Sequence, residues 1–196
     1  MRMKISAAIF VSAVAFNLGA FSLLPLLKIL PGAAVRAAEA KVEPMRVQSP
    51  DFAAGALIPK KFSADGVDQS PALVWSKAPA KAQSLVITCT DPDAPRGVWW
   101  HWIIFNLPAD AVELKGGQAK SASLVGGAGQ GTNDFGNVGY NGPAPPSGPV
   151  HHYHFAVYAL DSKLALKGGC SKAELNAAMH GHIIGGGEYV GTYVRR

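Results

Sequence analysis

Residues 91–107, DPDAPRGVWWHWIIFNL, constrain the fold of this chain more than any other stretch. The preceding run SLVITCT is apolar and β-branched, so it predicts a buried strand that ends at Asp91. Side chains alternate along a strand, which puts Asp91 on the face that carries Ile87 and Cys89. A carboxylate on a buried face must be paired, hydrogen-bonded or open to a cavity. This acid therefore indicates either a structural ion pair or a binding site.

The chain then turns at Pro92 and Pro95 and returns in a second strand-like run, WWHWIIFNLP. Alternation predicts that one face of this strand carries His101, Ile103, Phe105 and Leu107. Two strands joined by a short turn are expected to be neighbours, so Asp91 and His101 should lie near one end of the same sheet. The plainer interpretation is a salt-bridged turn with a histidine that serves only the structure.

Residues 1–40 have the pattern of a secretory signal peptide. A short basic start precedes residues 5–27, which carry no charge, and the sequence Ala-Glu-Ala at the end fits a cleavage site. We expect cleavage after Ala40, export to the periplasm or secretion, and a single mature domain over residues 41–196. The alternative is an uncleaved membrane anchor, because 23 uncharged residues are long enough to span a bilayer.

The net charge of +5 is partly a property of this signal segment. Residues 41–196 hold 14 basic and 12 acidic residues, which leaves +2. So small a charge, without a basic stripe, gives little support for nucleic acid as a partner. Cys89 and Cys170 are expected to be free thiols, although an exported protein could form a bridge between them. No metal-type pair of cysteines occurs, so no metal site built on cysteines is expected, and no cofactor is expected either.

Many short β-type runs, separated by turn signals, predict a mainly β domain with one helix. Strands are expected at 41–47, where an extended arm is the alternative, and at 60–65, 71–76, 84–91, 99–107, 150–160 and 189–194. Ser171 and Glu174 form a capping box that begins a helix over 172–180. Val112 and Leu114 are expected to contact the core.

Residues 115–150 contain ten glycines, four prolines and no hydrophobic period. A loop of this length is either functional or disordered. Disorder usually goes with high charge, but only three charged residues occur here, and Phe135 and Tyr140 can dock on the domain. We therefore expect an ordered loop. Its proline-rich end, 142–148, should form a stiff wall in which the Ala144 N–H can point at an anion; the alternative is a plain surface loop.

The expected strand at 150–160 carries histidines on both faces. Alternation groups His151 with Tyr153, and His152 with His154. An anion pocket would use the first pair, whereas a metal site would use the second pair with further ligands. The residues alone leave both alternatives open.

Three segments together resemble the phosphatidylethanolamine-binding protein family, in its bacterial Raf kinase inhibitor-like branch. They are DPDAP with WWHWIIFNLP within 91–108, GYNGPAPPSGPVHHYHFAVYAL at 139–160, and AELNAAMHGHIIGGGEYVGTYVRR at 173–196. The resemblance covers residues 45–196, essentially the whole mature chain. It implies the family fold, which has a large central antiparallel sheet, a smaller second sheet and a few peripheral helices.

The resemblance also implies an anion pocket that takes the phosphate of a phospholipid head group. The corresponding residues of this chain are Asp91, His101, His151, Tyr153, Trp99, Ala94, Pro95 and Ala144. Ala144 stands where the family has a backbone donor, often a glycine, so a positive φ there would be costly. Eukaryotic members carry a C-terminal helix with a ligand-contacting tyrosine beside the pocket. This sequence ends with GTYVRR instead, so we expect a more open pocket.

These residues favour a non-catalytic binding module, rather than an enzyme, for phosphate-bearing small ligands or lipid head groups. Imidazole and phenol groups can donate hydrogen bonds to phosphate oxygens. No fixed arginine or lysine is evident in the pocket, so we expect modest affinity. One alternative is a protein inhibitor of a protease or kinase that acts through the pocket rim. Another is a hydrolase that uses Asp91, His101 and His151, although no Gly-x-Ser-x-Gly motif occurs.

Overall fold

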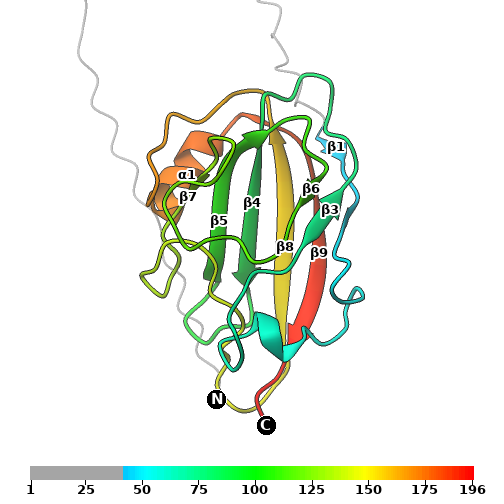
Figure 1. The fold of residues 1–196 in the computed structure, drawn as a ribbon, viewed down its shortest axis with the longest axis vertical. Coiled ribbons are helices and arrows are strands. Elements are labelled where there is room, and N and C mark those ends of the chain that lie inside the picture. The colour runs from blue at the N-terminus through cyan, green and yellow to red at the C-terminus, as the bar shows by residue number, and fades with distance from the viewer. Residues whose placement is uncertain (1–41) are drawn as a thin grey trace, which may run out of the picture. The chain divides into compact units, whose positions relative to one another are not determined.

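The computed structural model describes residues 42–196, and the expected signal peptide with its cleavage site lies outside them. The described chain forms two β-sheets and one α-helix (Figure 1). No helix in this part of the chain is long and apolar enough to cross a membrane. The elements in chain order are β1 (Glu43–Pro44), β2 (Val47–Gln48), the 3₁₀-helix η1 (Lys60–Phe62), β3 (Leu73–Trp75), β4 (Ser84–Asp91), β5 (Trp99–Pro108), β6 (Glu113–Leu114), β7 (Gly129–Gln130), β8 (His151–Leu160), α1 (Lys172–Met179) and β9 (Ile183–Tyr193).

The larger sheet has six strands in the order β1-β9-β8-β4-β5-β7, and the smaller sheet has the order β2-β3-β6. Neighbours in the larger sheet are antiparallel, except that β1 runs parallel to β9. The expected mainly β fold with a large and a small sheet is therefore confirmed, although β1 makes the large sheet mixed.

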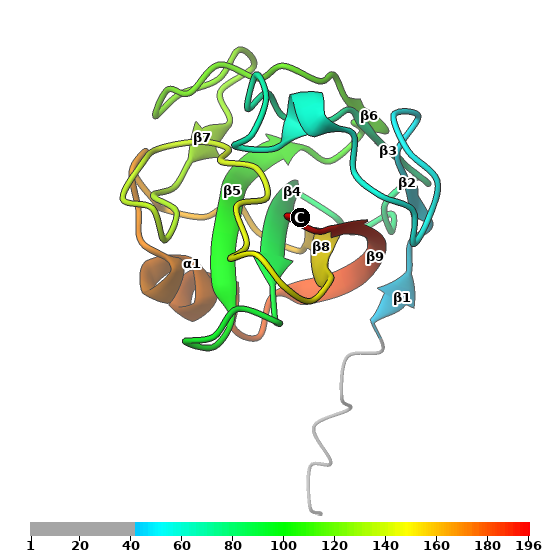
Figure 2. The ribbon, with the colours of Figure 1, turned by 90° about the horizontal axis from the view of Figure 1, so that it is seen from below.

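Both faces of the large sheet are covered, as Figure 2 shows for α1 and the small sheet. On one face, side chains of β4, β5 and β8 pack against Leu73, Trp75 and Leu114 of the small sheet. On the other face, the sheet packs against Leu175 and Met179 of α1. Removal of apolar surface from water on both faces stabilises the sheet and explains why β4 is buried along nearly its whole length.

The register between β4 and β5 contains a bulge at His101. The consecutive β4 residues Cys89 and Thr90 pair with Trp102 and Trp100, so the residue between these two tryptophans has no partner. A bulge redirects a side chain relative to simple alternation. The prediction that His101 shares a face of its strand with Ile103 and Phe105 was therefore wrong.

A second bulge lies at Asn106, whose φ of 59° is in the left-handed region. The Asn106 side chain exchanges two 2.8 Å hydrogen bonds with the backbone of Leu164, and these contacts hold the strained conformation. Leu107 consequently joins the core between the two sheets, whereas Phe105 packs on the side of α1. The prediction that these two side chains share a face was also wrong.

Three smaller expectations had different outcomes. Residues 60–65 do not form a strand, because the lysines at 60 and 61 are exposed while Phe62 and Ser63 are buried, and the segment begins with the 3₁₀-helix η1. Val112 is exposed, so only Leu114 of the expected pair contacts the core. The capping box at the start of α1 is confirmed.

The glycine-rich loop is ordered, as its composition predicted. Gln130 is fully buried and accepts a 2.7 Å hydrogen bond from Trp102 Nε1. Its amide nitrogen donates to the carbonyl oxygens of Ala119 and Ser121, at 2.7 and 2.8 Å. Tyr140 is also buried, as a docking point should be. These contacts hold the loop against β5.

Replacement of Gln130 by alanine should lower the free energy of unfolding by about 2–4 kcal/mol, because it leaves a buried indole N–H and two carbonyl oxygens without partners. Urea denaturation measures this change. Gln118 is the matched control, since its side chain makes a single exposed hydrogen bond to the Lys115 carbonyl. Its alanine variant should differ from the parent protein by less than about 0.5 kcal/mol. Equal losses in the two variants would contradict the role assigned to Gln130.

Candidate functional site

A cavity of about 240 Å³ opens where β4 ends and β5 and β8 begin. All eight residues that the sequence analysis proposed for a pocket line this one cavity. The complete lining consists of Asp91, Ala94, Pro95, Arg96, Trp99, His101, Phe135, Ala144, Pro145, Pro146, His151 and Tyr153. Segments far apart in the chain therefore converge here, as the resemblance to the family implied.

Asp91 and His151 form a buried pair in the cavity lining. His151 Nδ1 lies 2.7 Å from Asp91 Oδ2. His151 is only 2% exposed and Asp91 only 3%. A carboxylate oxygen accepts, so Nδ1 carries the proton and the Nε2 edge is left for other partners. The second Asp91 oxygen accepts the Asp93 N–H at 2.9 Å. The buried charge thus has a donor at each oxygen, as a buried charge requires.

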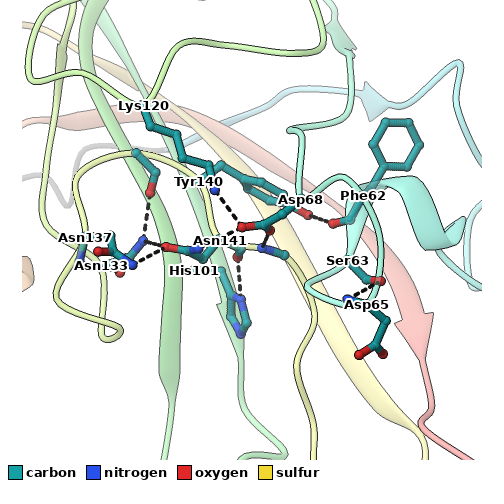
Figure 3. Close-up of polar contacts among 12 residues, drawn as sticks. Phe62, Ser63, Asp65, Asp68, His101, Lys120, Asn133, Asn137, Tyr140 and Asn141 are labelled. Carbon is teal, nitrogen blue, oxygen red and sulfur yellow. Dashed lines mark hydrogen bonds and ion pairs between the residues drawn. The ribbon is translucent and has the colours of Figure 1, made fainter.

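His101 is fixed by the backbone rather than by an acid. Its Nδ1 lies 2.7 Å from the Asn141 carbonyl oxygen, and its own carbonyl accepts the Asn141 N–H at 3.0 Å (Figure 3). A carbonyl oxygen can only accept, so Nδ1 carries the proton. Burial lowers the pKa of His101 below its usual 6.5, against the opposing effects of the Asn141 hydrogen bond and the Asp91 charge. At neutral pH the ring is therefore uncharged and has a lone pair at Nε2.

The Tyr153 hydroxyl is the unsatisfied group of the site. It is buried, belongs to a residue that lines the cavity, and has no hydrogen-bond partner among the described residues. Burial, followed by the Asp91 charge, raises the pKa of Tyr153 well above its usual range, so the phenol keeps its proton. The ring packs edge-to-face against His101, with 5.1 Å between centroids. A buried donor without a partner is costly, and a ligand that accepts its proton would remove that cost.

The turn between β4 and β5, which forms part of the rim, is also held to β8 on the outside. Asp93 Oδ2 lies 2.8 Å from the His152 backbone nitrogen and 2.7 Å from its Nδ1. These hydrogen bonds from His152 lower the pKa of Asp93. Consecutive residues of β8 therefore bind the two ends of this segment on opposite faces of the sheet: His151 bonds to Asp91 within the cavity, and His152 bonds to Asp93 on the outside.

The alternative of a metal site on the outer face of β8 finds no support. His152 pairs with Asp93, whereas His154 Nδ1 lies 3.1 Å from Glu188 on β9. Within residues 42–196, no group of three or more His, Cys, Asp or Glu side chains is placed to hold a metal ion. These surface histidines form separate pairs with carboxylates instead.

Ala144, Pro145 and Pro146 form one wall of the cavity, here called the proline-rich wall. Gly142 stands at its start, where a Cβ would approach a backbone carbonyl oxygen to 2.0 Å. The Arg195 guanidinium donates to the Pro145 carbonyl at 3.2 Å, so the wall is also held by the C-terminal segment. Ala144 does not have a positive φ, so the expected backbone cost does not arise. Its N–H makes no hydrogen bond to another residue of the described chain.

Arg96 lines the cavity, although no sequence pattern identified it. It directly follows DPDAP and is exposed, so the cavity has a positive charge at its rim that the residue patterns did not predict. Phe135, expected only as a docking point for the loop, also lines the cavity, with its ring centroid 5.5 Å from that of Trp99. Side chains in turns and loops follow no period, so alternation gave no information on these two residues.

Tyr153→Phe should leave the free energy of unfolding unchanged, or raise it by up to about 1 kcal/mol, because the lost hydroxyl is buried without a partner. Tyr140→Phe is the matched control, since that hydroxyl donates to the Phe62 carbonyl at 2.8 Å and its loss should cost about 1–2 kcal/mol. Urea denaturation of both variants decides the matter. A greater loss for Tyr153→Phe than for Tyr140→Phe would show that the Tyr153 hydroxyl is bonded within the protein.

Comparison with known proteins identifies the family of this domain. Residues 48–194 match the family model for phosphatidylethanolamine-binding protein. A UPF0098 protein of Methanothermobacter thermautotrophicus is 46% identical over 138 residues, which cover 70% of this chain and 91% of the relative. The UPF0098 protein YbhB of Escherichia coli is 43% identical over 123 residues, which cover 61% and 78%.

Two solved structures share the fold at similar coverage. A phosphatidylethanolamine-binding protein homologue from Chlamydia trachomatis superposes with a TM-score of 0.70 at 41% identity, covering 79% of this chain and 99% of the homologue. Escherichia coli YbcL, described as a member of the mammalian family, gives a TM-score of 0.73 at 31% identity, covering 78% and 99%. The chain therefore belongs to the phosphatidylethanolamine-binding protein family, in the bacterial and archaeal branch that includes YbhB and YbcL.

Proposed function

We propose that this protein is a non-catalytic binding module whose cavity takes a phosphate-bearing small ligand or the phosphate of a phospholipid head group. The observation that carries the proposal is the Tyr153 hydroxyl, which is buried, keeps its proton and has no partner among the described residues. The same lining holds the His151–Asp91 pair and Arg96. An anion with several oxygens could accept hydrogen bonds from all of these donors. Family membership supports the same ligand class.

Each polar group has a distinct part in this proposal. Tyr153 donates its O–H to one ligand oxygen, and His151 donates from Nε2 when it is protonated. Asp91 keeps the His151 ring in place. Arg96 at the exposed rim adds a positive charge that attracts anions from solution. Neutral His101 accepts a ligand O–H or N–H at Nε2, and protonated His101 donates to an anion instead.

The chemistry of the cavity supports binding rather than catalysis. Its lining contains no serine, threonine or cysteine that could act as a nucleophile. Cys89, two residues before Asp91, is fully buried, and burial raises the pKa of its thiol well above the usual range. A thiol that keeps its proton is a poor nucleophile. Cys89 and Cys170 are both free.

We also propose that binding takes place outside the cytoplasm, since residues 1–40 have the pattern of a signal peptide. The mass of the protein recovered from the periplasm or the medium should correspond to a chain that begins at Lys41. A full-length mass would favour the uncleaved anchor.

Titration with inorganic phosphate or phosphoethanolamine should change tryptophan fluorescence saturably, because Trp99 lines the cavity. His151→Ala should weaken binding at least about tenfold, since a hydrogen bond to a charged group contributes about 1.5–3 kcal/mol. His182→Ala is the matched control, because that ring also pairs with a carboxylate, Asp161, at 2.8 Å, but it lies on the surface and not in the cavity lining. Its affinity should equal that of the parent protein.

A flat fluorescence response from the parent protein would contradict the proposal. Vesicles with and without phosphatidylethanolamine distinguish a lipid head group from a free ligand. If the parent protein releases phosphate from phosphoesters and the Asp91→Asn variant does not, the hydrolase alternative is favoured instead.

Affinity for a phosphodiester should rise as the pH falls from about 8 to about 5. A diester keeps one negative charge over this range, so the change reports the protein alone. Because burial lowers the pKa of His101 below 6.5, its charged form adds a donor only towards the acidic end. His101→Gln should remove that part of the rise, as measured by calorimetry. An affinity that is independent of pH in the parent protein would exclude a binding role for charged histidine.

A further inference from the structure

Asp68 lies outside the cavity lining, yet it is hydrogen-bonded to Asn141, the partner of the lining residue His101 (Figure 3). Its φ of 58° is in the left-handed region, which residues other than glycine rarely adopt. Only 20% of its side chain is exposed. A strained backbone and a largely buried carboxylate both cost free energy, and they persist only where surrounding contacts hold them in place.

The Asp68 carboxylate accepts three hydrogen bonds. Oδ1 accepts the Gly142 N–H at 2.6 Å, where the proline-rich wall begins. Oδ2 accepts from Asn141 Nδ2 at 2.8 Å and from Lys120 Nζ at 2.6 Å. The Asn141 carbonyl in turn accepts from His101 Nδ1. Two short paths therefore connect Asp68 to the cavity, one to the wall and one to the His101 ring.

Asn141 is held from its other side as well. Its side-chain oxygen accepts hydrogen bonds from Asn133 Nδ2 and Asn137 Nδ2, at 2.9 and 3.1 Å. With both ends of its amide bonded, the Asn141 side chain has one orientation, and only an acceptor at Asp68 matches its Nδ2 group. This network acts together with the Asn141 N–H bond to the His101 carbonyl to place the Asn141 carbonyl opposite the His101 ring.

We propose that Asp68 is a positioning residue for the anion site: it holds the carbonyl that decides which nitrogen of His101 is protonated, and it anchors the proline-rich wall. For its effect on a ligand, the inference rests on the proposed function. Its effect on His101 needs no ligand. Loss of the carboxylate would free the His101 ring to exchange its donor and acceptor nitrogens, and the cavity would fit an anion less well.

The charges around His101 make this role measurable. Asp91 faces the ring from β4, the Tyr153 phenol faces it from β8, and Asp68 with its partner Lys120 lies behind it. The negative charges of Asp91 and Asp68 both raise the pKa of His101 against the larger effect of burial. Asp68→Asn should therefore lower the His101 titration midpoint. Lys120→Gln, which leaves Asp68 without its counter-charge, should raise it.

NMR titration of the His101 ring protons, with phosphate binding on the same samples, tests the inference. Asparagine is suited to position 68 because it tolerates a left-handed φ, so the variant adds no backbone strain. Asp51→Asn is the matched control: Asp51 is 23% exposed, accepts the Ala72 N–H at 2.8 Å and lies 3.6 Å from Lys61, outside the cavity lining. Asp68→Asn should weaken phosphate binding about tenfold, whereas Asp51→Asn should change neither property.

An Asp68→Asn protein with the parental His101 midpoint and phosphate affinity would overturn the inference. If Asp68→Asn fails to fold, the Lys120→Gln variant replaces it in the test, because Lys120 is exposed and its substitution should not disturb folding. A His101 titration midpoint in Lys120→Gln that is unchanged or lower than in the parent protein would also overturn the inference. A parent protein that does not bind phosphate would refute the proposed function. The His101 titrations would still show whether Asp68 acts on the ring.

Discussion

The hydrogen bond between Asp91 and His151 is the contact on which the site depends. Asp91 is only 3% exposed, and so deeply buried a carboxylate is stable in a folded protein only if donors meet its oxygens. One donor comes from β8, and the other is the Asp93 N–H of the turn between β4 and β5. The acid therefore joins three parts of the chain at one point. The turn that forms part of the rim begins at this junction.

Regular strands were the part of the site that the sequence could predict. β4 and β8 pair continuously from Ser84 to Thr90, so alternation correctly grouped Asp91 with the core face and His151 with Tyr153. Alternation failed on β5, because the bulges at His101 and Asn106 shift its phase twice. A bulge depends on which residues of two strands pair, and one strand's sequence does not contain that information.

Contacts that depend on the path of loops were beyond prediction from residue patterns. Composition indicated that residues 115–150 are ordered, but not that Phe135 would reach the cavity. Asp68 likewise gives no periodic signal, and its importance follows only from contacts with Asn141 and Gly142, more than seventy positions away. Resemblance to the family supplied Ala94, which no argument from alternation would have selected.

The bulge at His101 takes a residue of the cavity lining out of the regular pairing between β4 and β5. Cys89 and Thr90 keep their partners on either side of His101, so the identity of the residue at that position is not part of the pairing between β4 and β5. A bulged residue of this kind can be aimed at a site while the strands on either side of it stay in register. A substitution of His101 should therefore alter the polar groups that the cavity presents, while the pairing of the two strands stays the same.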